Sequence, residues 1–382
     1  MDFAPTPRQQ AMLDAAEDIM RVHRERQEAR GQDENSRFPR ELSASLGEAG
    51  LLTLWADPDV ADPFSCASLV QELVGYHDGT AASILFVNNA ASAILSRGCS
   101  SPLNRDVLDQ ACRGKINFSF AVTEPEAGSD VAALQTTAQA DGEGFVVNGV
   151  KSYATGAADA DYILIVALTS TDGPAKGGTS LFLVPGDAAG LTKRKLVKPT
   201  GDAHATCKLT LEDVRVPSDH LVGEHNGAWR LLFLGGVVER LLVAAVSVGV
   251  AQRAFDQARD FLSERKQFGQ SIIEFQAVNH RLADHLSEIE AMRWLTRHAA
   301  WSADCGIDAP SRINMAKLFA SERGSAIVSD LMRLVGGRGY FPDDPLNLAA
   351  REIGLSLFAG GSSEIQRNGI ARGLMATPAA MK

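Results

Sequence analysis

One carboxylate lies in an otherwise apolar segment of the chain. In LLFLGGVVERLLVAAVSVGVA, residues 231–251, only Glu239 and Arg240 are charged. On a helix Glu239 shares its face with Leu242 and Val246, so the carboxylate is expected to project toward apolar surroundings. Burial costs free energy unless the charge is paired, and it raises the pKa above the ordinary value of about 4.3. The pattern therefore indicates either a general base or a buried ion pair with another helix, and Arg240, roughly 100° away on the helix, is not the obvious partner.

A glycine-rich loop precedes the last predicted helix. FAGGSSEIQR, residues 358–367, has two glycines and two serines followed by a sequence typical of a first helical turn. The first N–H groups of a helix have no partner within the helix, so this arrangement suits an anionic or electron-rich group. Gly360 and Gly361 occupy positions where a side chain could have done chemistry, which raises the question of why glycine is needed there.

Two stretches of the middle region combine strands with hydroxyl groups. FAVTEPEAGSD, residues 120–130, predicts a strand that leads Val122 and Thr123 into a loop with free hydroxyl and N–H groups. In KSYATGAADADY, residues 151–162, Tyr153 and Thr155 share one side of a strand because alternate side chains point the same way. An aromatic ring beside a hydroxyl could flank a flat cofactor. Taken alone, each stretch is explained more simply as a structural turn or a packed strand.

Two further stretches lie in the C-terminal third. ERKQFGQSIIEFQ, residues 264–276, places Arg265 and Phe268 three apart at a helix end, where a guanidinium suited to phosphate lies beside a ring, although a solvated helix end is the commoner explanation. The glycines of LVGGRGYFPDD, residues 334–344, follow a predicted helix rather than a strand, so they lack the Rossmann context. No Walker motif is present and none of the eight histidines forms a metal-ligand pattern, so no metal site is predicted.

Helical segments flank a β-rich middle region. Apolar residues recur at helical spacing over residues 7–30, and a second helix is predicted over residues 39–50. Short β runs fill residues 116–223, among them FVVNGVKSY with a turn at Asn148-Gly149. Long helices are predicted at roughly residues 237–266, 272–303 and 312–335, lengths that suit a helical bundle able to form an oligomer interface.

Composition excludes several classes of protein. The net charge of −10 disfavours a nucleic-acid partner, which would require a basic face. The five cysteines are scattered without paired spacing, which indicates reduced thiols. The first ten residues lack an apolar targeting core, and no run of about 18 apolar residues is present, so no membrane association is predicted. A cytoplasmic protein is expected.

Taken together, and in their order along the chain, the six stretches resemble the acyl-CoA dehydrogenase family. The resemblance covers nearly the whole chain and is weakest in the first hundred or so residues. VTEPEAGSD, RKQFG, VGGRG and GGSSEIQR are specific as a set. The resemblance implies a mainly α fold with a β domain: an N-terminal helical domain over residues 1–115, a β-barrel-like domain over 116–223 and a C-terminal four-helix bundle over 224–382. It also implies FAD as cofactor and oxidation of an acyl-CoA thioester to the enoyl-CoA, in which a carboxylate removes the Cα proton and the flavin accepts hydride from Cβ.

Roles follow from the resemblance residue by residue. The residues that match cofactor contacts are Phe120, Val122, Thr123, Ser129, Tyr153, Thr155, Arg265, Phe268, Gln276, Gly336, Gly337, Ser362 and Glu364. Those expected near the substrate are Ser129, Arg240, Gly360 and Gly361. In the family, the residues matched by Arg265, Phe268 and Gln276 reach the FAD of a neighbouring subunit, so a homotetramer or a dimer is expected.

The resemblance also explains in part why the loop has a glycine at position 360. Many members of the family place the catalytic glutamate where this chain has Gly360. A branch that resembles the isovaleryl-CoA and long-chain enzymes places it instead on the first long helix of the C-terminal domain, followed by Arg, and this chain has Glu239-Arg240 there. The burial argument and the family match thus select Glu239 as the base. Two alternatives stay open: Glu364, whose family counterpart is usually Gln, and a site with no base at all.

Departures from the family pattern bear on the substrate. Arg333 replaces a common Gln, Phe120 replaces a frequent Tyr, and KPTGDAHATCK, residues 198–208, lacks the usual Gly-x-Arg. A base moved away from the final loop leaves room around Cα and Cβ, so a short or branched acyl chain is the working hypothesis.

Rival hypotheses share the same fold. They are an acyl-CoA oxidase, a flavin monooxygenase, and a dehydrogenase or reductase of a specialised-pathway or carrier-protein thioester. A rival of a different class is a binding protein with a decayed active site. Some relatives of the family bind DNA through added basic segments, and the tail GLMATPAAMK offers none. For a dehydrogenase, the expected electron acceptor is an electron-transferring flavoprotein.

Overall fold

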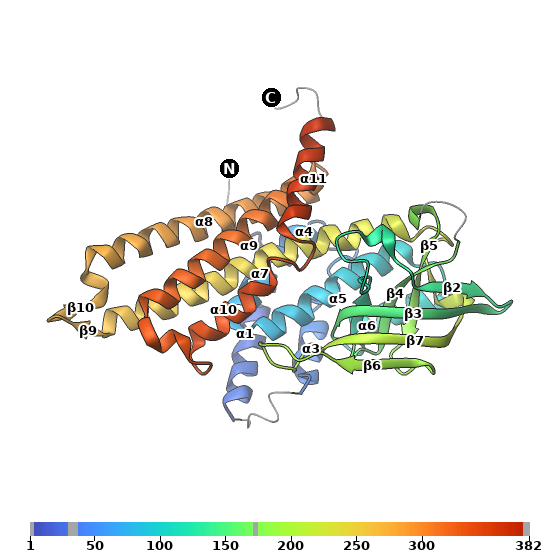
Figure 1. Cartoon of the computed structure of the whole chain (residues 1–382), viewed down its shortest axis with the longest axis horizontal. Helices are drawn as coiled ribbons and strands as arrows, with labels where there is room; N and C mark the ends of the chain where they lie inside the picture. The colour runs from blue at the N-terminus through green and yellow to red at the C-terminus, as the bar shows by residue number, and fades with distance from the viewer. Residues whose placement is uncertain (1–3, 30–36, 171–174, 377–382) are drawn as a thin grey trace. The chain divides into compact units, whose positions relative to one another are not determined.

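Helices occupy the chain up to Cys112 and again from Ala228, and the main sheet lies between Phe118 and Val222 (Figure 1). This structure, a computed structural model, describes residues 4–29, 37–170 and 175–376. The described residues form two compact units. The bundle unit comprises residues up to Leu13, Asp62–Ala82 and Arg240 onward, and the sheet unit comprises Asp14–Ala61 and Ser83–Glu239. The three-segment division at 115 and 223 stays a prediction.

The first third of the chain is helical, as the apolar spacing predicts. Its helices are α1 (Pro7–Ala29), α3 (Arg40–Glu48), α4 (Pro63–His77), α5 (Gly79–Gly98) and α6 (Pro102–Cys112). The two helices predicted at 7–30 and 39–50 are confirmed to within a few residues, and residue 30 itself lies outside the described residues. Local sequence sets the start of α6: Pro102 occupies its first turn, and the Ser101 hydroxyl accepts the Asn104 N–H at 3.1 Å.

The sheet unit is built on one mixed sheet. Its strands are β1 (Phe118–Ala121), β2 (Thr137–Ala140), β3 (Gly144–Thr155), β4 (Tyr162–Leu168), β5 (Thr179–Pro185), β6 (Leu191–Lys195), β7 (Thr206–Pro217) and β8 (Leu221–Val222). They pair in the order β6-β7-β3-β2-β4-β5-β8, and β1 pairs in parallel with β4. The sheet curves so that β3 and β7 face β4 and β5.

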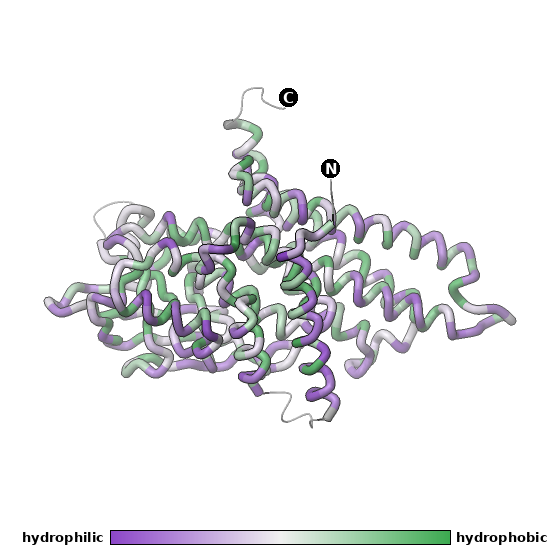
Figure 2. The backbone as a smooth tube through the Cα atoms, turned by 180° about the vertical axis from the view of Figure 1, so that it is seen from behind, coloured by the Kyte–Doolittle hydropathy of each residue, from purple (hydrophilic) through white to green (hydrophobic). Residues whose placement is uncertain are grey.

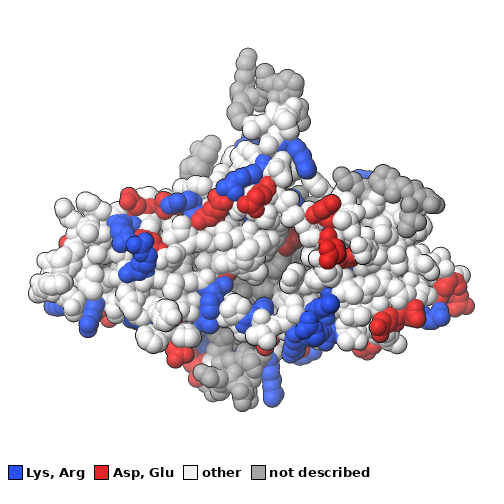
Figure 3. Space-filling view, in the orientation of Figure 1, with Lys and Arg blue, Asp and Glu red and all other residues white. Residues whose placement is uncertain are grey.

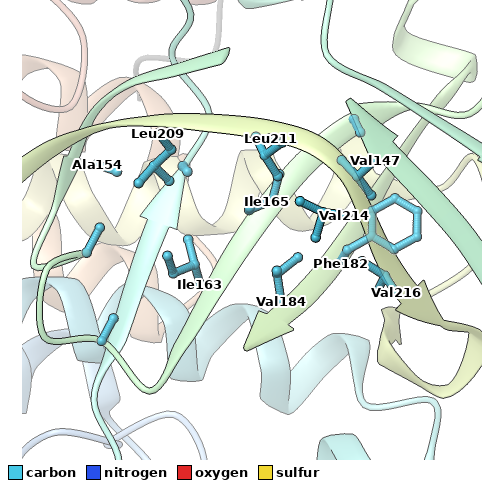
Figure 4. Packing of buried hydrophobic residues seen from close by; sticks show 14 of the residues in the cluster. Val147, Ala154, Ile163, Ile165, Phe182, Val184, Leu209, Leu211, Val214 and Val216 are labelled. Carbon is cyan, nitrogen blue, oxygen red and sulfur yellow. The ribbon is translucent and has the colours of Figure 1, made fainter. Parts of the chain in front are cut away.

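Strands β4 and β5 are buried on both faces, which explains their continuous apolar sequences. Ile163, Ile165, Phe182 and Val184 point toward β3 and β7, where they meet Val147, Leu209, Leu211, Val214 and Val216 (Figure 4). The alternate residues Leu164, Val166, Leu181 and Leu183 pack on the opposite face against Ile94 and Leu95 of α5 and Val107 of α6. The period of two along each strand thus assigns its residues to two different cores.

The predicted turn at Asn148-Gly149 is wrong, because both residues lie inside the single strand β3. Pairing with β7 shifts register between Val147 and Gly149, so the dipeptide forms a bulge. Gly149 has φ 151°, and a Cβ there would lie 2.5–2.7 Å from atoms of Thr136. The Asn148 side chain instead hydrogen-bonds Asp213 on β7 in both directions, at 3.1 and 2.8 Å. Close backbone approach, and not chain reversal, explains the glycine.

Long helices dominate the bundle unit. They are α7 (Ala228–Glu264), whose first residues up to Glu239 belong to the sheet unit, α8 (Gln276–Asp304), α9 (Ala309–Leu334), α10 (Pro345–Leu355) and α11 (Ser363–Ala376). A short hairpin, β9 (Lys266–Gln267) and β10 (Gln270–Ser271), joins α7 to α8. On α9 the residues Ile313, Ala316, Ala320, Ile327 and Leu331 recur at helical spacing and are fully buried. Hydrophobic and hydrophilic residues accordingly alternate along α8 and α9 (Figure 2).

Among the residues that the structure describes, two helices meet the length and composition of a membrane span, which the sequence prediction did not foresee. They are α5 and α7, and 72% and 56% of their most apolar windows are buried inside the protein. Burial of this extent is typical of the core helices of a globular protein. On the face drawn in Figure 3, Lys and Arg side chains are interspersed with Asp and Glu side chains. All five cysteines are free thiols.

Candidate functional site

The first predicted segment follows β1. Phe120, Val122 and Thr123 are half-buried, and Ser129 is exposed. Beyond Thr123 the chain reverses, because the Glu124 N–H donates to the Ala127 carbonyl at 3.0 Å and the Ala127 N–H donates back at 3.2 Å. The loop therefore has a fixed backbone with its hydroxyl residues before and after the reversal.

The end of β3 lies beside this loop. The Ser152 N–H donates to the Thr123 carbonyl at 2.7 Å, and the Ser119 hydroxyl donates to the Thr155 carbonyl at 2.8 Å. Five of the residues predicted to contact the cofactor are thereby brought together: Phe120, Val122, Thr123, Tyr153 and Thr155.

The conformation of Tyr153 corrects the simple alternation assumed for this strand. Tyr153 has φ 58°, and pairing with β7 shifts register between Lys151 and Ala154, so alternate side chains no longer point the same way. A large side chain in the left-handed region is uncommon and is typical of functional sites. The ring of Tyr153 is 68% exposed, so the conformation presents an aromatic surface to solvent.

Glu239 is half-buried on α7, whereas the sequence predicts a buried carboxylate. The preceding Val237 and Val238 are buried, at 5% and 0% exposure. The residue is therefore neither fully buried nor fully exposed. Its raised pKa stays a prediction.

The glycine-rich loop of the bundle unit is held by its carbonyl oxygens. The Arg240 Nε–H donates to the Gly360 carbonyl at 3.1 Å, and Gln366 Nε2 donates to the carbonyls of Gly360 and Gly361 at 3.1 and 3.0 Å. Lys317 Nζ donates to the Gly361 carbonyl at 2.7 Å. In a trans peptide the N–H points away from the preceding carbonyl, so the N–H groups of Gly361 and Ser362 point away from these donors.

The structure explains why glycine occupies both positions. Gly360 and Gly361 have φ 67° and 93°, a region that residues with a Cβ rarely adopt. A Cβ on Gly360 would also lie 3.3 Å from Cγ of Arg240. The loop thus needs glycine for its backbone conformation and for the close approach of Arg240.

Lys317 and Gln366 are site residues that the sequence analysis missed. Both are fully buried, at 0% exposure. The signal available for Lys317 was a lysine on the apolar face of α9, between Ala316 and Ala320. A buried lysine is costly unless it is hydrogen-bonded, and here the loop carbonyls supply the acceptors.

The start of α11 bears on the alternative base, Glu364. The Ser362 hydroxyl accepts the Ile365 N–H at 3.4 Å, so Ser362 caps the helix. Glu364 is exposed, and hydrogen bonds from its own backbone N–H and from the Ser362 hydroxyl lower its pKa. A carboxylate with a lowered pKa is a weaker base, which disfavours Glu364 in that role.

The other predicted cofactor residues gather at one end of the bundle unit. Arg265, Phe268 and Gln276 lie around the β9–β10 hairpin and are exposed, Phe268 at 96%. Gly336 and Gly337, also exposed, open the short 3-10 helix η5 (Gly336–Tyr340) after α9. The guanidinium of Arg338 in η5 lies 4.6 Å from the ring centroid of Phe261, one turn before Arg265 on α7.

Two negative observations limit the chemistry. Among the described residues, no group of three or more His, Cys, Asp or Glu side chains is arranged to hold a metal ion. A surface groove between α1 and α3, whose apolar lining includes Ile19, Val22 and Leu42, contains none of the predicted site residues.

Replacing Gly360 tests the account of the loop. We expect Gly360→Ala to lower the free energy of unfolding by about 1–2 kcal/mol, because alanine is strained at positive φ and its Cβ meets Arg240. Urea unfolding measures the change. Gly354→Ala in α10 is the matched control, since nothing lies within 4 Å of its Cβ position and its φ is negative. Equal stability of the two variants would contradict the account.

Comparison with known proteins identifies relatives of the chain. Residues 119–214 match the family model described as acyl-CoA dehydrogenase, middle domain, and residues 235–375 match acyl-CoA dehydrogenase, C-terminal domain. The chain is 34% identical to a cyclohexane-1-carbonyl-CoA dehydrogenase of Geobacter metallireducens over 88% of this chain and 89% of the relative. It is 31% identical to a 3-(aryl)acrylate reductase of Clostridium sporogenes over 90% and 92%. The solved glutaryl-CoA dehydrogenase complex with glutaryl-CoA superposes with TM-score 0.91 at 27% identity, covering 100% of this chain and 98% of that one.

Proposed function

Because the chain belongs to the acyl-CoA dehydrogenase family, a family of FAD-dependent oxidoreductases, we propose that it oxidises a short or branched acyl-CoA to the enoyl-CoA with Glu239 as the base. The observation that supports this assignment best is the hydrogen bond from Arg240 to Gly360. This bond joins Arg240, the neighbour of Glu239, to Gly360, the position where many members of the family have their catalytic glutamate.

The residues of the sheet unit fit a flavin. Tyr153 offers an exposed aromatic ring on which a flat heteroaromatic ring can stack. The hydroxyls of Thr123 and Thr155 and the backbone groups of the fixed loop can hydrogen-bond the edge of such a ring. We assign Phe120, Val122, Thr123, Tyr153 and Thr155 to the flavin ring. Ser129 is assigned to the nearby flavin or to the phosphate-bearing arm of the substrate.

The bundle unit supplies the remaining cofactor assignments. Residues that contact the FAD of a second subunit must be exposed on their own subunit. This is true of Arg265, Phe268, Gln276, Gly336 and Gly337, which supports a homotetramer or a dimer. Ser362 and Glu364 are assigned to FAD at the start of α11. When bound, FAD supplies the hydride acceptor.

Each polar group of the proposed site has one task. Glu239 removes the proton at Cα. The N–H groups of Gly361 and Ser362 donate to the thioester carbonyl oxygen, which stabilises the charge that develops as the proton leaves. Arg240, Lys317 and Gln366 keep those donors in place.

The acyl group is proposed to be branched or cyclic at the carbons that react. Gly360 has no side chain, so no glutamate at this position meets the acyl group. A relative that is 34% identical acts on cyclohexane-1-carbonyl-CoA, in which Cα lies in a ring, according to its name. Electrons are proposed to pass to an electron-transferring flavoprotein, and a cytoplasmic location stays a prediction.

An anaerobic titration of the purified protein with straight, branched and cyclic acyl-CoAs tests the proposal. We expect branched or cyclic thioesters to bleach the flavin absorbance fastest. A highest specificity constant for a straight medium chain would refute the branched assignment. If no acyl-CoA bleached the flavin, the dehydrogenase function itself would be contradicted.

The same reaction in reverse is the second candidate, because the relative of Clostridium sporogenes is named a reductase. Reducing the flavin chemically and adding enoyl thioesters separates the two directions. Rapid reoxidation by an enoyl thioester, with no bleaching by any saturated acyl-CoA, would favour the reductase.

A further inference from the structure

Lys151 on β3 and Glu124 after β1 form an ion pair inside the sheet unit. Lys151 Nζ lies 2.7 Å from Oε1 of Glu124, and the two side chains are 0% and 4% exposed. Neither residue has a role in the proposed chemistry. Two charges are rarely buried so completely, because removing them from water costs more than an ordinary ion pair returns.

Backbone groups complete the bonding of the pair. The Glu124 carboxylate also accepts the N–H of Thr136 at 3.0 Å and of Gln135 at 2.6 Å. Burial alone would raise the pKa of Glu124, but the Lys151 ammonium and these N–H groups hold it below its ordinary value. The carboxylate is therefore ionised at neutral pH, and the pair is a fixed feature of the fold.

The pair lies between the two segments that are assigned to the flavin. Lys151 Nζ donates to the Val122 carbonyl at 3.2 Å, and the next residue, Ser152, donates its N–H to the Thr123 carbonyl at 2.7 Å. Since Val122 and Thr123 share a trans peptide, the Thr123 N–H points away from Lys151. Tyr153, with its left-handed backbone and exposed ring, follows two residues after Lys151.

We propose that Lys151 and Glu124 are positioning residues for the flavin, which orient the Thr123 N–H and the Tyr153 ring without contacting the cofactor. This inference rests on the proposed function, which assigns those groups to FAD. A pair that only fastened β3 to the loop would affect the stability of the protein and leave the affinity of the folded protein for FAD unchanged.

Binding of FAD to the apoprotein tests the inference. The variants are Lys151→Met and Glu124→Gln, and the matched controls on the neighbouring strand β7 are Lys208→Met and exposed Glu212→Gln. FAD is removed, folding of each apoprotein is verified by circular dichroism, and quenching of FAD fluorescence gives the dissociation constant. We expect Lys151→Met to weaken binding at least tenfold and to change the visible spectrum of the bound flavin, while both controls match the wild type.

Each outcome is decisive. Wild-type affinity and spectrum in folded Lys151→Met would overturn the proposal. Glu124→Gln keeps the shape of the side chain and an acceptor oxygen, so it decides the question in the same way if Lys151→Met does not fold. If wild-type apoprotein did not bind FAD, the proposed function would fail together with this inference; if the wild type bound FAD and reacted with acyl-CoA while the variants bound equally well, only the inference would fail.

Discussion

We expect Glu239→Gln to slow flavin reduction by the accepted acyl-CoA by about 10²–10⁴-fold, the usual contribution of a general base. The amide has nearly the size of the carboxylate but cannot take the Cα proton. FAD content and acyl-CoA affinity are expected to stay near those of the wild type, because the residues assigned to them lie elsewhere. Anaerobic stopped-flow measurement of flavin absorbance gives the rate.

The matched control is Glu364→Gln at the start of α11. Glu364 is the other carboxylate considered as a base, and its lowered pKa and exposure disfavour that role. Flavin reduction in this variant is expected to remain within a fewfold of the wild type. Fast reduction in Glu239→Gln together with a large loss in Glu364→Gln would reverse the assignment.

We expect acid to destabilise the protein through His204. This side chain is buried at 3% exposure, with Nδ1 2.9 Å from the Ser83 hydroxyl, and burial together with the charge of Lys198 lowers its pKa from 6.5 to about 3. The unfolded chain takes up the proton near pH 6.5, whereas the folded chain does so only near pH 3. Stability is therefore full above pH 6.5 and is lost progressively as the pH falls toward 3. Since each pKa unit corresponds to about 1.4 kcal/mol, going from pH 8 to pH 5 removes about 2 kcal/mol.

Urea unfolding at pH 8 and pH 5 measures this contribution. In His204→Gln the difference in stability between the two pH values is expected to shrink by about 2 kcal/mol, because glutamine does not titrate. His280→Gln, at an exposed position on α8, is expected to leave the difference unchanged. The same pH dependence in His204→Gln and in the wild type would contradict the role of His204.

Local patterns predict most of the elements, because apolar period and turn residues are properties of neighbouring positions. The helices predicted at 237–266, 272–303 and 312–335 correspond to α7, α8 and α9. The start of α7 is missed by nine residues, since Gly235 and Gly236 favour a break. In the structure Gly235 packs against Ile94, whose Cδ1 would lie 2.6 Å from a Cβ, so tertiary packing outweighs its low helix propensity.

Local sequence signals likewise indicate some residues of the proposed site and not others. Glu239 and the glycine loop are visible in the sequence, since an isolated carboxylate and a glycine pair are local signals. The contacts of Lys317 with Gly361 and of Lys151 with Glu124 span 44 and 27 residues. No local pattern specifies such partners. The bulge at Asn148-Gly149 is also not visible in the sequence, because it depends on the position of Thr136.

Product analysis after a single anaerobic turnover shows whether the protein forms an enoyl-CoA and whether it needs Glu239 to do so. The protein is mixed with excess of the thioester that bleaches its flavin, quenched with acid, and the thioesters are analysed by mass spectrometry. We expect one enoyl-CoA, lighter than the substrate by two hydrogens, for each flavin reduced, and none from Glu239→Gln under the same conditions. Flavin bleaching without an enoyl product, or equal product from Glu239→Gln, would contradict this expectation.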